Sequence, residues 1–225
     1  MTDRLPHSLR SDALDNRERI LDAARALFAA EGLNVPMREI ARRAGVGPAT
    51  LYRRFPTKQM LVTEAFMDEM RACHAIVDEG CADPDPWRGL CFVIERICEL
   101  HARNRGFTDA FMSTIPDGMN LAAGRDRTLN SISVLARRAK DAGRLRSDFV
   151  LDDLILMLMA NRGIRAVSMA AQVTASRRFA ALVIQAFQAS GKHSPLPPVA
   201  RLAPAAPGER VVSGGPAGGL GDDRG

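Results

Sequence analysis

The sequence lacks the features that mark membrane and secreted proteins. Its longest unbroken apolar run, Leu154–Ala160, has seven residues, far fewer than the roughly 20 that a transmembrane helix needs. The amino terminus is polar and charged, without the apolar segment of a secretory signal peptide. We therefore expect a cytoplasmic protein with no membrane partner.

Motifs of common enzyme classes are missing as well. There is no glycine-rich phosphate loop, no nucleophile elbow and no HExxH sequence. The four histidines are scattered, without an obvious acid–base partner: His7, His74, His101 and His193. The sequence therefore predicts no catalytic residue and no cofactor. An enzyme, or a helical interaction protein that binds no DNA, is kept as an alternative.

Cysteine is scarce, and the four cysteines form no CxxC pair. In the cytoplasm we expect reduced thiols, which pack as small buried hydrophobic groups, and we expect no metal site. Cys91, Cys98 and His101 are seven and three residues apart, so they share one face of a helix. A thiol- or metal-responsive regulator that uses these three residues is a second alternative.

Period-two alternation of β-branched residues is absent, which argues against strands. Apolar residues instead recur at helical spacing, beginning with an amphipathic helix that carries Ile20, Ala24 and Phe28 and ends at Gly32. A long helix is expected after Thr57. Others are expected near residues 87–103, 107–115, 126–142, 152–167 and 179–187. The pattern predicts an all-α fold of about nine helices.

The most informative stretch is Met37–Lys58, MREIARRAGVGPATLYRRFPTK, which indicates two short helices joined by a tight turn. Gly45 can adopt the positive φ that ends the first helix, and Val46 fills the turn. Pro48 suits the first position of the second helix, because its missing N–H costs nothing there. Two helices around such a turn make a helix-turn-helix unit.

The second helix of this unit has an apolar face and a polar face. Leu51 and Phe55, four apart, are expected to face inward. The remaining surface carries Thr50, Tyr52, Arg53 and Arg54. Cationic and hydroxyl groups suit phosphates, and long side chains can reach base edges. The pattern favours a helix that enters the DNA major groove; an ordinary helical hairpin with a solvated basic face is the alternative.

The charge distribution agrees with DNA binding. The whole chain carries a formal net charge of +5, of which residues 1–60 hold +4, whereas residues 61–190 are neutral. Positive charge near the helix-turn-helix favours DNA through release of condensed counterions. An excess of four charges is modest and would not suffice without the motif.

The segment LFAAEGLNVPMREIARRAGVGPATLYRRFPTKQMLVTEAF resembles the amino-terminal domain of the TetR (tetracycline repressor) family of bacterial transcriptional regulators. The resemblance runs from about Arg17 to about Phe66. It implies a three-helix DNA-binding domain at residues 16–58, after a flexible arm at 1–15. It also implies a helical regulatory and dimerisation domain at 59–190, and a disordered tail rich in Pro, Ala and Gly is expected at 191–225.

The resemblance also implies roles for individual residues. Positions nearest the bases would be Pro48, Ala49 and Tyr52, and phosphate-contacting positions would be Thr50, Arg54 and Lys58. Arg38 suits a guanine, whose O6 and N7 accept its guanidinium bidentately, and Arg53 would contact bases or backbone. Gly47 replaces a frequent Ser or Thr, as Val35-Pro36 replaces a hydroxyl residue, so the contacts of those hydroxyls are missing. The Gly47 N–H can still meet a phosphate.

Two of these positions have a purely structural alternative. Tyr52 could cover the hydrophobic seam of the motif, and Arg38 could pair with a nearby acid. Arg42 and Arg43 are interpreted as solvated surface rather than as DNA contacts.

The last two helices are expected to form the dimer interface, because members of the family pair them with their copies as a four-helix bundle. The apolar run after Asp153 covers almost every helix face, so that helix should be buried on more than one side. The expected interface residues are Leu154, Leu158, Phe179, Leu182, Val183, Ala186 and Phe187. A purely intramolecular core is the alternative. A two-fold dimer would read a palindromic operator in double-stranded DNA.

Between the two ends of the chain, Met and aromatic residues exceed what simple helix packing needs. The family resemblance implies a small-molecule site here, and these flexible or flat side chains suit an apolar or amphipathic effector. The candidate lining residues are Phe66, Met70, Trp87, Phe92, Phe107, Phe111, Met112 and Met119. Plain hydrophobic core is the alternative for each. The implied mechanism is a repressor that its effector releases from the operator.

Overall fold

The computed structural model describes residues 5–112, 119–189 and 196–197, and it describes the side chains of residues 15–112, 123–189 and 196–197. Over these residues the chain forms ten α-helices and no regular strand, which confirms the all-α expectation. No helix in this part of the chain is long and apolar enough to cross a membrane.

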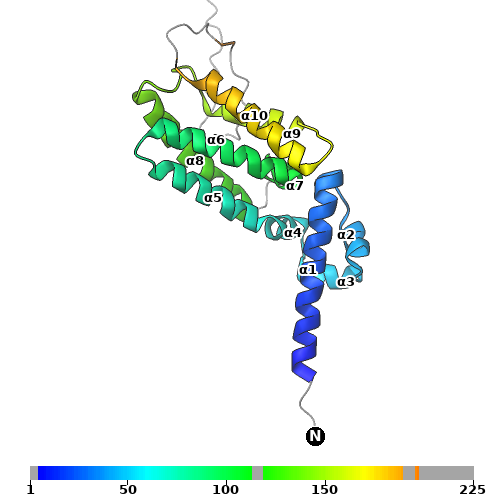
Figure 1. Ribbon diagram of the computed structural model, residues 1–225. Coiled ribbons are helices and arrows are strands. Elements are labelled where there is room, and N and C mark those ends of the chain that lie inside the picture. Colours follow the sequence, from blue (N-terminus) through cyan, green and yellow to red (C-terminus); the bar gives the residue numbers. More distant parts are fainter. Residues whose placement is uncertain (1–4, 113–118, 190–195, 198–225) are drawn as a thin grey trace, which may run out of the picture.

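The helices fall into two groups, which we call the head and the body (Figure 1). The head consists of α1 (Leu5–Glu31), α2 (Met37–Ala44), α3 (Pro48–Arg54) and α4 (Lys58–Ala65). The body consists of α5 (Met67–Ala82), α6 (Pro86–Arg103), α7 (Arg105–Met112), α8 (Met119–Asp141), α9 (Leu151–Gly163) and α10 (Met169–Phe187).

Two details differ from the sequence-based expectation. The long helix expected after Thr57 is divided at Phe66, whose φ of −117° and ψ of 16° interrupt the helical backbone between α4 and α5. This break accounts for the tenth helix. The expected flexible arm at residues 1–15 is also corrected for residues 5–15, because α1 begins at Leu5, while residues 1–4 lie outside the described part of the chain. Figure 1 shows the amino-terminal part of α1 projecting beyond α2 and α3.

Helix α1 is the scaffold of the head. Its Ile20, Ala24 and Phe28 are completely buried, and the helix packs against α2, α4 and α7. The Arg25 Nε–H donates to the Ala65 carbonyl oxygen at the end of α4 (2.8 Å), and Arg17 forms an ion pair with Glu64 of α4. These contacts join the helix-turn-helix to the first helix that leads into the body.

Helix α6 is the central element of the body and packs against α5, α7, α8, α9 and α10. Its Leu90, Val93 and Ile94 are fully enclosed. A buried polar cluster ties the last two helices to it. The Asn161 Nδ2–H donates to the Cys98 carbonyl oxygen (3.0 Å), and the Ser176 hydroxyl lies 2.7 Å from Asn161 Oδ1. Such directional contacts inside an apolar core favour one alignment of α9 and α10 on α6.

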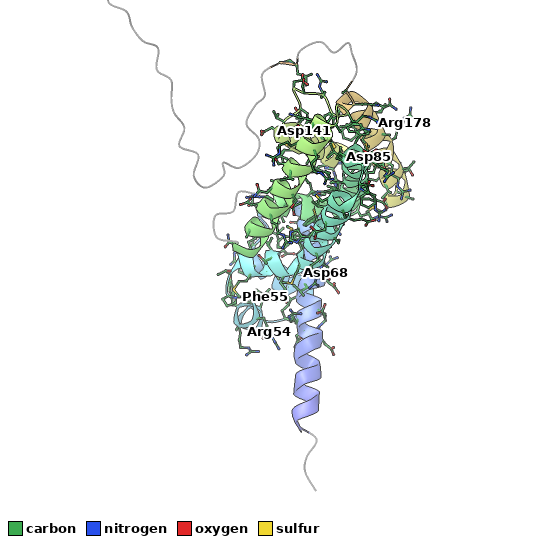
Figure 2. All side chains as sticks on the ribbon, turned by 90° about the vertical axis from the view of Figure 1, so that its left-hand side faces the viewer. Arg54, Phe55, Asp68, Asp85, Asp141 and Arg178 are labelled. Carbon is green, nitrogen blue, oxygen red and sulfur yellow. The ribbon has the colours of Figure 1, made fainter. Side chains whose placement is uncertain are left out.

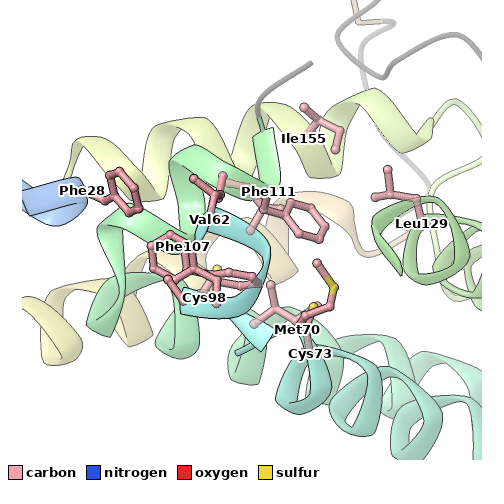
Figure 3. Packing of buried hydrophobic residues seen from close by; sticks show 14 of the residues in the cluster. Phe28, Val62, Met70, Cys73, Cys98, Phe107, Phe111, Leu129 and Ile155 are labelled. Atoms are coloured by element: carbon pink, nitrogen blue, oxygen red, sulfur yellow. The ribbon is translucent and has the colours of Figure 1, made fainter. Parts of the chain in front are cut away.

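A line of aromatic rings joins head and body. The centroid of the Phe28 ring in α1 lies 6.0 Å from that of Phe66, and Phe66 lies 6.1 Å from Phe107 of α7. Figure 3 shows Phe28 and Phe107 within the same cluster of buried side chains. At the junction, a Cβ on Gly106 would lie 2.9 Å from Phe66 Cζ and 3.1 Å from the α1 backbone. The close approach of α7 to α1 therefore requires glycine at this position.

Candidate DNA-binding surface and effector region

The turn between α2 and α3 is built by local backbone chemistry. Gly45 has φ 66° and ψ 34°, the left-handed conformation that glycine adopts without a Cβ clash. The Val46 N–H then donates to the Ala41 carbonyl oxygen (3.0 Å), so the end of α2 is satisfied. Helix α3 starts with Gly47 as its N-cap and Pro48 as its first residue. The sequence predicted these features because each depends on a few neighbouring residues.

The apolar side chains of the motif face the head core. Ile40, Leu51 and Phe55 are no more than 2% exposed, and they pack in the same hydrophobic core as Ile20 of α1. Burying a side chain of this size contributes about 1.5–3 kcal/mol to the stability of the fold, relative to leaving it exposed. This anchoring fixes which face of α3 is turned outward.

Most of the predicted DNA-contacting residues lie on that outward face. Arg38, Gly47, Pro48, Ala49, Tyr52, Arg53 and Arg54 are exposed, and Thr50 and Lys58 are half-buried. Figure 2 shows Arg54 extending from the head on the side away from the body. The structure thus gathers these residues from α2, α3 and the start of α4 into one region of the head.

The contacts in this region bear on the structural alternatives. Tyr52 is 46% exposed, while Leu51 and Phe55 close the seam that Tyr52 could have covered. The acid beside Arg38 is Glu39, which accepts hydrogen bonds from Arg42 (2.9 Å from Nε to Oε2). The same guanidinium lowers the pKa of the Glu39 carboxyl. Arg42 is thus engaged on the surface, as expected for a residue outside the DNA contacts.

The start of α4 completes the region. Thr57 is its N-cap and accepts a hydrogen bond from the Met60 N–H (3.2 Å). Lys58 follows, and partial burial lowers the pKa of its ammonium group. A helix amino terminus with a neighbouring cation suits a phosphate group.

The head also contains a hollow that the sequence did not indicate. It has a volume of about 300 Å³ and is lined by Arg19, Asp22, Ala23, Ala26, Arg43 and Ala44. Its residues come from α1 and α2, which are separated in the chain, so no local pattern could have revealed it.

The predicted effector residues divide into separate places. Phe66, Phe107 and Phe111 are buried and in ring contact, with 5.8 Å between the last two centroids. Met70 is buried in the same cluster (Figure 3). Trp87 is buried near the start of α6, about 21 Å along the helix axis from His101 near its end. Phe92 and Met112 are half-buried, and the Met119 side chain lies outside the described residues.

Sequence reasoning assigned the core of this region only to apolar side chains, but a histidine lies at its centre. His101 is 1% exposed. Its ring centroid lies 5.1 Å from that of Phe107 and 5.4 Å from that of Phe111. Enclosure among these rings lowers the pKa of His101 to about 4, because burial disfavours the charged imidazolium. The signal in the sequence that could have indicated this buried histidine was its spacing of three residues from Cys98, which places both on one helix face.

The thiol- or metal-responsive alternative gains no support from the geometry. Burial raises the pKa of Cys98 to about 12 and that of Cys91 to about 11, whereas the reactive form of cysteine is the thiolate. Cys98 Sγ packs 3.9 Å from Met157 Sδ. Among the described side chains, no three His, Cys, Asp or Glu residues are grouped so as to hold a metal ion.

The exposed apolar face of α9 differs from the expected one. Leu154 and Leu158 are 1% exposed within a single chain, so they pack inward rather than toward a second copy. The large apolar residues exposed on α9 are instead Leu156 (56%) and Met159 (48%). Within one chain α9 is thus buried on one face, and its second apolar face is uncovered. The sequence could not separate the two faces because both are apolar.

The residues expected on α10 lie where a partner could reach them, although not all equally. Leu182 is 54% exposed and Ala186 is exposed, whereas Phe179, Val183 and Phe187 are half-buried. Phe187 is held from one side by Phe149, with ring centroids 5.0 Å apart in an edge contact.

Comparison with known proteins gives matches along most of the chain. Residues 20–65 match the model of the bacterial regulatory proteins of the tetR family. The HTH-type transcriptional repressor KstR of Mycolicibacterium smegmatis is 31% identical over 157 residues, which cover 64% of this chain and 77% of that protein. The KstR repressor of Mycobacterium tuberculosis is 36% identical over 98 residues, covering 43% of this chain and 44% of that protein.

Solved structures show the same fold. The ketosteroid transcriptional regulator KstR2 of Mycobacterium tuberculosis has a TM-score of 0.62 at 18% identity and covers 77% of this chain and 95% of its own. The TetR family regulator PfmR of Thermus thermophilus has a TM-score of 0.59 at 21% identity, over 74% and 97% of the two chains. Taken with the outward-facing helix-turn-helix, the sequence matches establish that this chain is a DNA-binding transcriptional regulator of the tetR family.

Proposed function

We propose that this regulator is a cytoplasmic homodimeric repressor that binds a palindromic operator and is released from it by a small apolar or amphipathic effector. The observation that carries the DNA-binding part is the division of α3: Leu51 and Phe55 are buried, while the polar residues between and beside them are exposed. A short helix anchored in this way can enter the major groove without disturbing the core.

The roles proposed for the individual residues are those that the family resemblance implies, and the exposure of most of these residues supports them. Pro48, Ala49 and Tyr52 would lie nearest the bases, and Arg38 would bind a guanine bidentately. Thr50, Arg54, Lys58 and the Gly47 N–H would contact phosphates, which position the head without selecting a sequence. Arg53 would contact either the bases or the backbone.

Dimerisation would use the exposed apolar face formed by Leu156, Met159, Leu182, Val183, Ala186 and neighbouring parts of Phe179 and Phe187. Leu154 and Leu158 would support this face from within the same chain. A two-fold dimer would hold two α3 helices roughly 34–36 Å apart, or a multiple of that distance, to match successive half-sites.

The line of rings from Phe28 through Phe66 to Phe107 supports a route between effector and head. Closely packed side chains change arrangement together rather than deform gradually. An effector that rearranged Phe107 or Phe111 would therefore alter the seating of α1 on α7, and with it the separation of the two heads. Allosteric coupling of about 1–3 kcal/mol would lower operator affinity roughly 5–150-fold.

Selection of binding sites from random double-stranded DNA tests the DNA-binding part. The full-length chain should enrich a two-fold symmetric sequence, and fluorescence anisotropy then measures its affinity for that sequence. Arg38→Ala should lose about 10–100-fold in affinity and tolerate other bases at one position of each half-site, since a bidentate contact contributes about 1–3 kcal/mol.

Arg42→Ala is the matched control, because Arg42 lies on the same short helix and is engaged with Glu39. It should change the affinity less than about 3-fold, as expected for an exposed ion pair. Equal losses in the two variants, or no enriched sequence at all, would contradict the proposed DNA-binding surface. A bound compound that leaves operator affinity unchanged at saturation would contradict only the effector switch.

A further inference from the structure

The histidine at the centre of the body is neutral and has one nitrogen with a defined partner. His101 Nδ1 lies 2.9 Å from the hydroxyl oxygen of Thr108 on α7. Enclosure by Phe107 and Phe111 lowers the pKa of the ring to about 4. At neutral pH the ring therefore carries a single hydrogen, either on Nδ1 or on Nε2.

The contacts of Thr108 decide which nitrogen carries that hydrogen. The Thr108 hydroxyl oxygen lies 3.2 Å from the Asn104 carbonyl oxygen and 3.3 Å from the His101 carbonyl oxygen. Carbonyl oxygens only accept, and we assign the single hydroxyl hydrogen to these two oxygens rather than to Nδ1. The hydroxyl oxygen then accepts from the ring, which places the hydrogen on Nδ1. Nε2 is left as an acceptor with an unshared electron pair.

This acceptor is buried and has no hydrogen-bond partner among the described residues. One turn earlier on α6, the carbonyl oxygen of Cys98 is bonded by both Asn161 and Ser176, so neighbouring polar groups of the same core are paired. Removing an acceptor from water without replacing its hydrogen bond is unfavourable. An apolar side chain in place of His101 would avoid this cost, and a ligand that donates a hydrogen bond to Nε2 would remove it.

We propose that the effector donates a hydrogen bond to His101 Nε2, and that it is an uncharged, mostly apolar molecule with an O–H or N–H group. The inference rests on the proposed function, because it assigns a chemistry to the effector of that regulator. A ketone, an ether or a carboxylate has no hydrogen to give and would oppose the electron pair of Nε2. The rings of Phe107 and Phe111 provide the apolar surroundings for the rest of the molecule.

Matched pairs of probes test the need for a donor. Two such pairs are 1-decanol with its methyl ether, and 4-cyclohexylphenol with its methyl ether. Titration calorimetry on the full-length wild-type chain should give at least one alcohol that binds about 10-fold or more tightly than its ether, since a site built to hydrogen-bond a hydroxyl rejects the analogue without it. Equal binding within each pair would overturn the proposal.

Variants locate the contact. In His101→Phe, which keeps a flat ring, the alcohol preference should fall below about 2-fold. His74→Gln is the control: His74 Nε2 is already paired with the Gly124 carbonyl oxygen (2.9 Å), so its loss should leave the preference intact. A preference that survives His101→Phe, or disappears in both variants, would contradict the assignment.

A measurement on the unmodified protein keeps the proposal testable if His101→Phe does not fold. Nitrogen-15 NMR of the histidine rings should show His101 protonated on Nδ1 and bare on Nε2, with the Nε2 resonance shifted only by the alcohols. A protonated Nε2, or a resonance that no alcohol shifts because water already occupies the site, would overturn it. Tight operator binding by the same sample would show that only this inference, and not the proposed function, had failed.

Discussion

In the head, the polar side chains of α2 and α3 extend into solvent, whereas the body also encloses polar side chains in its core, His101 of α6 and Asn161 of α9. Arg38 and Tyr52 can therefore be replaced without removing core contacts, while His101 and Asn161 cannot. The comparison teaches that the side chains of a DNA-binding surface can lie outside the hydrophobic core that supports them. The site proposed for a small apolar molecule would instead be part of the core itself.

This difference affects how variants of the two regions should be interpreted. A substitution on the exposed face of α3 should change operator affinity with little effect on stability, since exposed positions usually contribute less than about 0.5 kcal/mol. A substitution beside His101 changes folding and ligand binding together. Each of the following predictions separates the contribution of the head from that of the body.

The largest effect is expected from the body surface that never touches DNA. Leu156→Glu with Leu182→Glu places charges on the proposed dimer face and should give a monomer by analytical ultracentrifugation. Operator affinity should fall by about 100-fold or more, or about 3 kcal/mol, because one of two half-sites is lost. Val134→Glu is the matched control, since Val134 is 46% exposed on α8. A double variant that remained dimeric would remove this face from the proposal.

Acid should destabilise the body specifically through His101. Its pKa is about 4 in the folded chain, against an ordinary value of 6.5, so the unfolded chain binds a proton that the folded chain does not. The free energy of unfolding should therefore be highest above pH 6.5 and should decline by about 3 kcal/mol as the pH falls to 4.

Urea titrations of wild type and His101→Phe between pH 7 and pH 4.5 check this effect, and the variant should lose most of the slope. Carboxylates contribute at lower pH, because the pKa values of Glu99, Glu39 and Asp148 are all lowered by neighbouring guanidinium groups. A variant with an unchanged slope would show that another group titrates in this range.

The junction between the two regions should be sensitive to a single methyl group. Gly106→Ala places a Cβ against Phe66 and the α1 backbone, and such overpacking should lower the free energy of unfolding by about 1–3 kcal/mol. Chemical denaturation measures this change. Gly163→Ala is the control, because nothing lies within 4 Å of its added Cβ, and it should not destabilise the chain. Equal effects would mean that head and body do not meet as closely as described.

The smallest effect is expected within the head. Gly47 has a φ of −68° that any residue adopts, and nothing lies within 4 Å of an added Cβ. Gly47→Ser should stabilise the chain by a few tenths of a kcal/mol, because a hydroxyl can cap α3. Gly45→Ser should instead destabilise it by about 1 kcal/mol or more, since Gly45 has a positive φ. Thermal unfolding measures both effects: Gly47→Ser should raise the melting temperature, and Gly45→Ser should lower it.

The helix-turn-helix of the head was predictable from the sequence to the level of single residues. Gly45, Val46, Gly47 and Pro48 act on the backbone within a few positions, so their order specifies the end of α2 and the start of α3. The spacing of Leu51 and Phe55 likewise specifies which face of α3 turns inward, and so which polar residues are exposed. Helix type in the body was also predictable, because the apolar period of 3.6 residues is a local pattern.

The packing of the body could not be predicted from such local patterns. Helix α9 is apolar on most sides, so its sequence has no period that distinguishes Leu154 from Leu156. Packing against α6 turned Leu154 inward and left Leu156 exposed. Trp87 and Phe107 are both aromatic, so the sequence placed them at one site. In the structure Trp87 lies near the start of α6 and Phe107 on α7, which follows the end of α6.

The sequence by itself therefore determined the helical class, the helix-turn-helix and the outward face of α3, because these depend on backbone preferences and spacing over a few residues. Only the tertiary structure decided the exposed face of α9, the contact of Phe28 with Phe66 and the unpaired nitrogen of His101. Each of these depends on residues brought together from distant parts of the chain, where burial and the geometry of neighbouring helices decide which groups meet.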